Sequence, residues 1–320
     1  MTSATASAEF PVTVVFPGQG CQRPGMGRDF HDRFRSSRLA FEEASDASGL
    51  DLRILCFEQD PRLPLTEYSQ PAIVATEIAM LRGLAEGWGL IATRFGGHSL
   101  GEYSALVAAG VLALADAVRI VRERGRLMQA AVPVGHGAML AVLGETLDRQ
   151  AIDGCLAGLR VTVANDNSED QLVLSGPILE LREVARRISQ YRAGWRTVEL
   201  EVSAPFHSWM MAPIEPAFRE VLGESSAQWN TAGATCVTSN LTGGFHDADE
   251  GLLCDRLVGQ LSGSVRWRDN MTALASGSSA IFEVGPGRPL RGFFRTIGAE
   301  VVSVVDARSA ERALQARAAA

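Results

Sequence analysis

A serine between glycines is the first candidate for chemistry in this chain. The segment Gly97-His98-Ser99-Leu100-Gly101 lies between a predicted strand that ends at Gly97 and a predicted helix over 100–109. In such a GxSxG turn the small glycines permit a sharp bend, which exposes the serine hydroxyl above the helix N-terminus. The helix dipole and the free N–H of Leu100 would stabilise the oxyanion formed when Ser99 attacks a carbonyl. Taken alone, the pattern is also typical of a plain turn before a helix.

A serine nucleophile needs a general base, and His207 is the best candidate among the five histidines. It lies in Ser203-Ala204-Pro205-Phe206-His207-Ser208, at the end of a predicted strand where Pro205 interrupts the hydrogen-bond ladder. Nucleophile and base meet in space, so their separation along the chain is no obstacle. A purely structural histidine is the alternative interpretation of His207.

Other polar residues would support this pair. His98 sits inside the glycine turn and is expected to pack or hydrogen-bond beside the site, in contact with substrate. Asn240 and Gln260 are candidates to orient His207, while His31, His136 and His246 lie among polar or glycine-rich residues and are expected on the surface.

Arg124 is the most informative residue on physical grounds alone. On the predicted helix from Leu114 it shares one face with Ala117, Val121 and Met128, and that face is otherwise apolar. A buried unpaired guanidinium costs several kcal/mol, so Arg124 must meet an anion. The anion is either an internal Asp or Glu or the carboxylate of a substrate, which an ordinary esterase would not need.

A second glycine-containing loop, Gly18-Gln19-Gly20, follows the buried apolar strand predicted over 12–16. Such a loop can supply a backbone N–H to an oxyanion. It is not a dinucleotide fingerprint, because the GxGxxG spacing and its acidic ribose partner are missing.

The order of predicted elements indicates an α/β fold with an insert. Strands and helices alternate up to residue 132 and again from residue 204, which predicts an α/β-hydrolase-like domain with a parallel sheet. Between them we expect strands over 138–143, 160–164, 171–175 and 195–202 and helices over 146–159 and 177–191. This βαββαβ order predicts a ferredoxin-like subdomain over 133–203. Residues 310–320 are expected to form a frayed helix or a tail.

Composition excludes several classes of protein. The 320 residues are 46% hydrophobic and 21% charged, as in ordinary globular proteins with room for two domains. A net charge of −7 without a basic tract argues against a nucleic-acid binder. All 30 basic residues are arginines, which excludes lysine Schiff-base, pyridoxal-phosphate and P-loop chemistry.

Location is predicted from the same composition. No apolar run reaches the ~20 residues that span a bilayer, and the stretch Met1–Phe10 does not have the pattern of a secretory signal. The five cysteines are dispersed and form no CxxC pair, which favours reduced thiols over disulfides or a zinc site. We therefore expect a cytoplasmic protein that is not membrane-bound.

Taken together, these motifs resemble the malonyl-CoA:acyl carrier protein transacylases and the related acyltransferases of polyketide synthases. The resemblance extends over nearly the whole chain and rests on several motifs in the same order: Phe16-Pro17-Gly18-Gln19-Gly20, Gln70-Pro71-Ala72, Gly97-His98-Ser99-Leu100-Gly101-Glu102, Arg124-Gly125-Arg126-Leu127-Met128-Gln129, Ala164-Asn165-Asp166-Asn167, Ala204-Pro205-Phe206-His207-Ser208, Ser239-Asn240-Leu241-Thr242-Gly243 and Glu283-Val284-Gly285-Pro286-Gly287.

The resemblance implies a ping-pong transfer through a Ser99 acyl intermediate, with His207 as base and acid. In that family backbone groups, and not a carboxylate, orient the histidine. Gln19 and Leu100 would donate the oxyanion-hole N–H groups, and Arg124 would pair with the malonyl carboxylate. Phe206 would crowd a C2 methyl group and so favour malonyl over methylmalonyl.

The resemblance also implies the partners, which are a coenzyme A thioester and a holo acyl carrier protein, with no metal or cofactor. Arg288, Arg291 and Arg295 are candidates to dock the acidic carrier protein. Cys21, where serine is common, and Ala204-Pro205 depart from the family pattern, and the choice between fatty-acid and polyketide synthesis stays open.

Three alternatives remain. An acyl hydrolase acting on carrier-protein thioesters would use the same serine and histidine, but it would gain nothing from Arg124. A generic serine esterase leaves Arg124 and the insert unexplained. A non-catalytic carrier-binding protein would not need Ser99 and His207 together.

Overall fold

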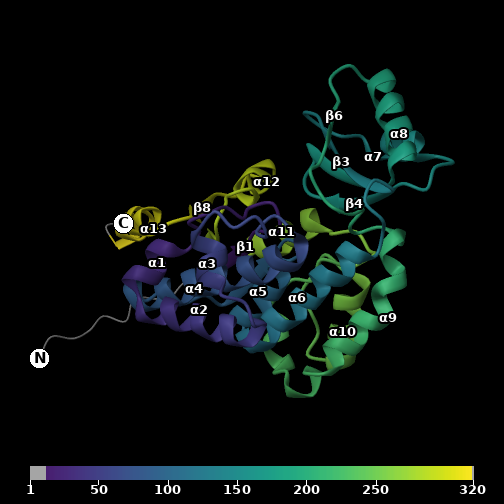
Figure 1. The fold of residues 1–320 in the computed structure, drawn as a ribbon. Helices are drawn as coiled ribbons and strands as arrows, with labels where there is room; N and C mark the ends of the chain where they lie inside the picture. The colour runs from purple at the N-terminus through teal and green to yellow at the C-terminus, as the bar shows by residue number, and fades with distance from the viewer. Residues whose placement is uncertain (1–11, 319–320) are drawn as a thin grey trace, which may run out of the picture.

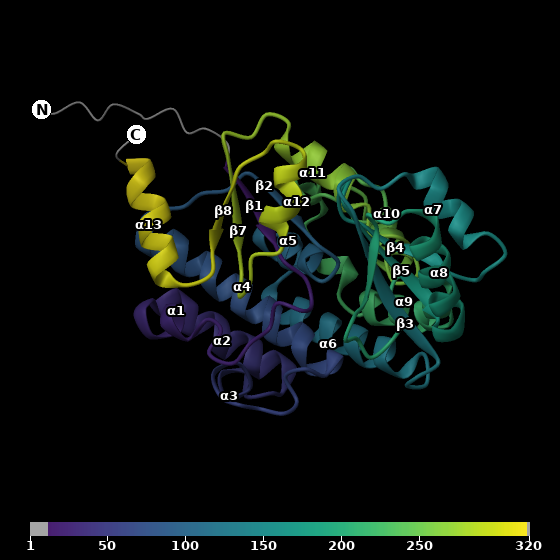
Figure 2. The same ribbon diagram turned by 90° about the horizontal axis from the view of Figure 1, so that it is seen from above.

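The computed structural model describes residues 12–318, which fold into two units that lie side by side (Figures 1 and 2). The predictions for Met1–Phe10 and for residues 319–320 fall outside this range. In chain order, the elements are β1 (Val12–Phe16), α1 (Arg28–Arg33), α2 (Arg35–Ser48), α3 (Leu52–Phe57), α4 (Thr66–Trp88), β2 (Arg94–Gly97), α5 (Gly101–Ala108), α6 (Leu114–Ala130), β3 (Gly137–Leu143), α7 (Arg149–Leu156), β4 (Thr162–Asp166), β5 (Gln171–Pro177), α8 (Ile178–Tyr191), β6 (Arg196–Glu199), η1 (Trp209–Ile214), α9 (Glu215–Gly223), η2 (Ser226–Gln228), η3 (Thr231–Cys236), α10 (Glu250–Gly259), α11 (Trp267–Ala275), β7 (Ala280–Val284), α12 (Leu290–Thr296), β8 (Val301–Val304) and α13 (Ala307–Ala318).

The larger unit is built on a parallel sheet with the strand order β2-β1-β7-β8. Its central strand β1 is buried along its whole length, because helices cover both faces of the sheet. Val14 and Phe16 point into one hydrophobic cluster, and Val15 points into a second cluster with Trp267 and Phe294. The alternation of side chains along a strand explains why neighbouring residues serve opposite layers.

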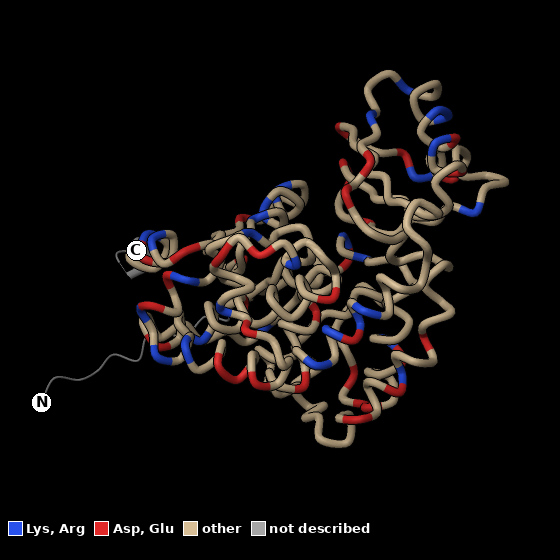
Figure 3. The backbone as a smooth tube through the Cα atoms, in the orientation of Figure 1, with Lys and Arg blue, Asp and Glu red and all other residues tan. Residues whose placement is uncertain are grey.

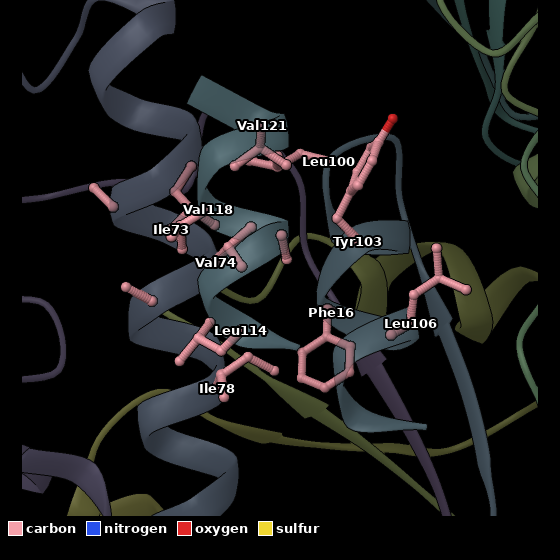
Figure 4. Packing of buried hydrophobic residues seen from close by; sticks show 14 of the residues in the cluster. Phe16, Ile73, Val74, Ile78, Leu100, Tyr103, Leu106, Leu114, Val118 and Val121 are labelled. Carbon is pink, nitrogen blue, oxygen red and sulfur yellow. The ribbon is translucent and has the colours of Figure 1, made fainter. Parts of the chain in front are cut away.

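Helices α4, α5 and α6 form the layer that supports the glycine turn. Figure 4 shows Phe16 of β1 packed among side chains of all three helices. Helix α4 is buried on nearly every side, which matches its apolar sequence and the absence of a polar face. Ser99 at the start of α5 and Arg124 on α6 are therefore carried by well-packed elements.

The smaller unit is an antiparallel sheet with the strand order β4-β5-β3-β6, with α7 and α8 packed on one face. Its chain order is β3-α7-β4-β5-α8-β6, the predicted βαββαβ arrangement. The expected fold of a parallel α/β unit with a separate, smaller antiparallel unit is confirmed. The boundaries at residues 133 and 203 stay a prediction.

Backbone contacts join the two units. Val265 bridges β4, because its N–H donates to Ala164 O at 2.8 Å and its carbonyl accepts from Asp166 N at 2.9 Å. Beside this bridge, the Trp209 indole donates to Arg160 O at 2.9 Å. The smaller sheet is thus held at its β4 edge against the larger unit.

Several predicted boundaries need correction. Helix α7 covers Arg149–Leu156 and not 146–159, because the Asp148 side chain caps the N–H groups of Gln150 and Ala151. Strand β6 is limited to Arg196–Glu199 instead of 195–202, and the C-terminal segment is helical as α13 up to Ala318. Over the described residues, no helix is both long and apolar enough to cross a membrane.

Candidate active site

Ser99 and His207 meet at the carboxyl end of the parallel sheet. The Oγ atom of Ser99 lies 2.7 Å from Nε2 of His207, although the two residues are 108 positions apart in the chain. The turn after β2 carries Ser99, and the segment before η1 carries His207. The structure therefore brings the predicted nucleophile and base within hydrogen-bond distance.

The backbone of the serine turn is strained. Ser99 has φ of 51° and His207 has φ of 55°, and over residues 12–318 they are the only residues other than glycine with positive φ. Two glycines make the turn possible, because a Cβ on Gly97 would lie 1.9 Å from Gly101 C and one on Gly101 would lie 2.3 Å from Phe16 O. Strain of this kind is typical of functional sites.

The hydrogen bond on the other side of the ring fixes the tautomer of His207. Its Nδ1 lies 2.7 Å from the carbonyl oxygen of Gln260, which can only accept, so Nδ1 carries the proton and Nε2 is free to accept one. Burial, followed by the positive charge of Arg124, lowers the pKa of His207 from 6.5 to about 3. The ring is therefore neutral at physiological pH and ready to act as a base.

Arg124 points from α6 to the same place. Only 1% of the residue is exposed. Its guanidinium donates to Gln70 Oε1 at 3.0 Å, to Gln260 Oε1 at 2.9 Å and to Ser99 Oγ at 3.4 Å, and it lies 5.5 Å from the centre of the Tyr103 ring.

No Asp or Glu pairs with this arginine within residues 12–318, so the predicted alternative of an internal salt bridge is wrong. Its Nε also has no hydrogen-bond partner in the described part of the chain. Burial lowers the pKa of Arg124, while nearby Tyr103 and Glu102 oppose that shift. The site thus holds a buried cation with neutral ligands, which favours an anionic ligand.

Two residues that line the cavity carry the backbone N–H groups predicted to form the oxyanion hole. In the described residues, neither Gln19 N nor Leu100 N has a hydrogen-bond partner, and both residues line the cavity that contains Ser99. Leu100 is the N-cap residue of α5, so its N–H lies at the positive end of that helix. The side chain of Gln19 donates to Thr66 Oγ1 at 3.3 Å, which holds its loop beside α4.

Asn240 holds the serine turn and not His207, which corrects the role predicted for it. Its Oδ1 accepts from Ser99 N at 3.2 Å, and its Nδ2 donates to Gly97 O at 2.8 Å. Gln260 does orient His207, but through its backbone carbonyl. The Gln260 side chain instead donates to Ser99 O at 3.1 Å and accepts from Arg124.

The cavity of about 960 Å³ lies between the two units. His98 and Phe206 both line it, and His98 also bonds Asn167 Oδ1 at 2.7 Å through Nε2. Burial lowers the pKa of His98. The opposite wall comes from the smaller sheet, including Met139 and Ala141 of β3, so both units are needed to enclose a ligand.

Sequence reasoning missed three residues of this site. Gln70 sits on the apolar helix α4, where a polar residue within a buried stretch was the available signal. Glu102 stands three positions after Ser99 and is buried, and its partner His246 was expected on the surface but is only 3% exposed. His136 is exposed, as expected.

The buried Glu102 and His246 do not belong to a metal site. Over residues 12–318, no group of three His, Cys, Asp or Glu side chains is arranged to hold a metal ion.

Known proteins resemble this chain over nearly its whole length. The acyl transferase domain family matches residues 13–284. A malonyl CoA-acyl carrier protein transacylase of Bacillus subtilis is 36% identical over 311 residues, which cover 95% of this chain and 96% of that protein.

Solved structures of proteins with the same activity in their names also resemble this chain. A transacylase of the same name from Clostridium perfringens aligns with a TM-score of 0.87 and 33% identity, covering 97% of this chain and 98% of its own. A malonyl-transacylase in complex with its type II PKS acyl-carrier protein aligns with a TM-score of 0.85 and 34% identity, covering 96% and 99%. With the serine turn, the histidine and the buried arginine in place, the chain belongs to the acyl transferase domain family.

Proposed function

We propose that this protein transfers a malonyl group from malonyl-CoA to the phosphopantetheine thiol of an acyl carrier protein. The observation that carries the proposal is Arg124, a buried cation 3.4 Å from the Oγ of Ser99 with no carboxylate of residues 12–318 within salt-bridge distance. A thioester whose acyl group ends in a carboxylate supplies that partner and places its carbonyl carbon at the serine. The transacylases named above act on malonyl-CoA and acyl carrier protein, which supports this substrate pair.

In the first half-reaction, Ser99 Oγ attacks the thioester carbonyl and its proton moves to Nε2 of His207. The negative charge on the carbonyl oxygen is stabilised by Gln19 N–H and Leu100 N–H. The C–S bond then breaks, and the protonated histidine returns the proton to the coenzyme A thiolate. Malonyl-Ser99 and coenzyme A thiol are the products.

In the second half-reaction, the phosphopantetheine thiol gives its proton to His207 and its sulfur attacks the ester carbonyl. Breaking the ester bond returns the proton to Ser99 and releases the malonyl-carrier thioester. The chemistry uses only groups of this chain, so we propose that no metal or cofactor takes part.

Phe206 is proposed to set the acyl selectivity. It lines the cavity one residue before the base. A bulky ring there would crowd a C2 methyl group and favour malonyl over methylmalonyl by about 1–3 kcal/mol.

The carrier protein is proposed to dock on Arg288, Arg291 and Arg295. All three are exposed, Arg288 lines the cavity, and the other two lie on α12. Figure 3 shows blue segments, the colour of basic residues, at the position of α12. We also propose a cytoplasmic location, which is supported by five free cysteines among the described residues.

A hydrolase that clears acyl groups from carrier proteins is the second candidate, because it would use the same Ser99 and His207. Arg124 argues against it, since varied acyl chains offer no carboxylate to a buried arginine. A generic esterase is disfavoured for the same reason, because it has no use for a buried Arg124. A non-catalytic carrier-binding protein would not need the 2.7 Å contact between Ser99 and His207.

The test is intact mass of the protein after incubation with malonyl-CoA, followed by addition of a holo carrier protein. We expect a malonyl adduct that Ser99→Ala abolishes and that passes to the carrier. Arg124→Ala should reduce malonyl loading more than acetyl loading. No adduct, combined with release of free acid from acyl-carrier thioesters, would assign the protein as a hydrolase.

A further inference from the structure

Beneath the serine turn lies a buried carboxylate that the mechanism above does not use. Glu102 on α5 is 1% exposed. Its Oε2 accepts from Asn240 N at 3.1 Å, from Asn240 Nδ2 at 2.5 Å and from Gln260 Nε2 at 2.5 Å, and its Oε1 lies 2.8 Å from His246 Nε2. The three nitrogens at Oε2 can only donate and His246 Nε2 can also donate, which is the pattern that an ionised carboxylate accepts.

The amide of Gln260 stands between this carboxylate and Arg124. Its oxygen accepts from the guanidinium, which can only donate, and its nitrogen donates to the carboxylate, which can only accept. The two charges therefore fix the same orientation of the amide. A chain of hydrogen bonds polarised in one direction strengthens each of its members.

His246 does not cancel the charge of Glu102. Its Nδ1 is buried and has no hydrogen-bond partner within residues 12–318, so a second ring proton would have no acceptor. The ring with a proton on Nε2 alone donates to Glu102 and remains neutral. The negative charge of Glu102 is left to balance Arg124.

We propose that Glu102 is the counter-ion of Arg124 when no substrate is bound and acts through the amide of Gln260 as a positioning residue for the acyl carboxylate. This rests on the proposed malonyl transfer. A direct salt bridge would occupy the guanidinium, whereas a neutral amide oxygen leaves it available to the substrate at lower cost. Glu102 thus balances the charge of Arg124 without competing with the ligand.

A second buried glutamate offers a matched control. Glu77 on α4 is fully buried and also contacts α5, where Ser104 Oγ donates to it at 2.5 Å. Burial raises the pKa of Glu77 well above its usual value, and within residues 12–318 no hydrogen bond joins it to Gln260 or Arg124. Replacing Glu77 by glutamine therefore alters a buried carboxyl group outside the Arg124 network, whereas the same change at Glu102 alters one within it.

The experiment is a double-mutant cycle in thermal unfolding at pH 7.5 and low salt, with E102Q, R124Q and both together. In E102Q the amide oxygen can take over the three bonds at Oε2, and the amide nitrogen can donate to His246 Nε2 once that ring carries its proton on Nδ1. We expect the double variant to lose less in Tm than the two single losses combined, by at least ~2 °C. The cycle of E77Q with R124Q should be additive, and additivity in both cycles overturns the proposal.

If E102Q alone does not fold, the proposal is tested by whether the double variant folds. A folded double variant supports the counter-ion role, because removing Arg124 removes the unbalanced charge. If E102Q and the double variant both fail while R124Q and E77Q fold, the role of Glu102 is structural and the proposal is wrong.

Acylation gives a second readout that a structural role would not change. A malonyl group on Ser99 brings its own carboxylate to Arg124, whereas an acetyl group does not. The Tm of the malonyl adduct should exceed that of the acetyl adduct by more in E102Q than in the wild type, and an equal difference overturns the proposal. A wild type that forms no malonyl adduct would refute the proposed function, while the cycle on the free protein would still test Glu102.

Discussion

At the scale of single residues, His207 is held in surroundings that oppose a positive charge. Burial and Arg124 both disfavour the protonated ring, and the folded pKa of about 3 lies far below the usual 6.5. The base is therefore neutral, and competent, throughout the range in which a free histidine would titrate. Protonation of His207 would stop the reaction only at a pH far below 6.5.

This predicts the pH dependence of Ser99 modification by a neutral sulfonyl fluoride. In the wild type, the second-order inactivation rate should not fall between pH 8 and about 5, since the acid limb lies nearer pH 3. Arg124→Gln removes the second-largest cause of the shift, so the pKa of His207 rises and the limb moves to higher pH. Arg122→Gln on the same helix is the control, and a wild-type midpoint near pH 6.5 would contradict the prediction.

The reacting residues could be predicted because each breaks a local pattern. Ser99 stands between glycines, and Arg124 interrupts an apolar helix face. His246 could not be placed, because its polar neighbours predict a surface position while the buried carboxylate of Glu102, distant in sequence, keeps it inside. Hydrogen-bond partners of this kind are set by tertiary structure, which residue spacing does not report.

At the scale of elements, the strands were predicted well where apolar runs end in glycine. Strand β1 ends at Phe16, as its sequence indicates, and the ferredoxin-like order of the smaller unit follows from its alternating patterns. The ends of α7 and β6 were missed because a side-chain cap and a short pairing with β3 decide them. Propensity alone does not resolve such ends.

The packing of helix α6 gives a second prediction. Gly125 has no side chain, which allows α6 to lie against the start of α4. A Cβ at Gly125 would lie 2.5 Å from Thr66 O and 2.9 Å from Glu67 Cα, which are backbone atoms that cannot move aside. Gly125→Ala should therefore push α6 outward, cost about 1–3 kcal/mol in free energy of unfolding, and displace Arg124 next to it. Malonyl loading should fall more than acetyl loading.

A matched control for this variant is Gly154→Ala on α7, where a Cβ would meet nothing within 4 Å. Loading and thermal unfolding of both variants are measured together. Equal losses of malonyl and acetyl loading in Gly125→Ala would show that α6 is not positioned by this contact.

At the scale of the whole molecule, the cavity has one wall from each unit and α12 at its mouth. Arg288 lines that cavity, while Arg291 and Arg295 on α12 are exposed. Within residues 12–318, none of the three takes part in an ion pair, so their charges are available to an acidic partner. The net charge of −7 makes such a local patch necessary.

Charge reversal at this patch should separate the two half-reactions. The triple variant R288E/R291E/R295E is expected to reduce transfer to the carrier protein at least ~10-fold, with a weaker salt dependence, because steering of the acidic partner is lost. Transfer to free pantetheine should change little. Reversal of Arg186, Arg187 and Arg192 on and after α8 is the control, and unchanged carrier-dependent turnover in the first variant would reject the patch.

The positive φ angle of Ser99 sets stability and activity against each other at the same position. Glycine would adopt the conformation of Ser99 or of His207 without strain, so Ser99→Gly should make the fold more stable while removing the nucleophile. At His207 the relief of strain is opposed by the loss of a buried ring and its two hydrogen bonds. A selection for more stable variants that does not also select for turnover will therefore favour inactive molecules.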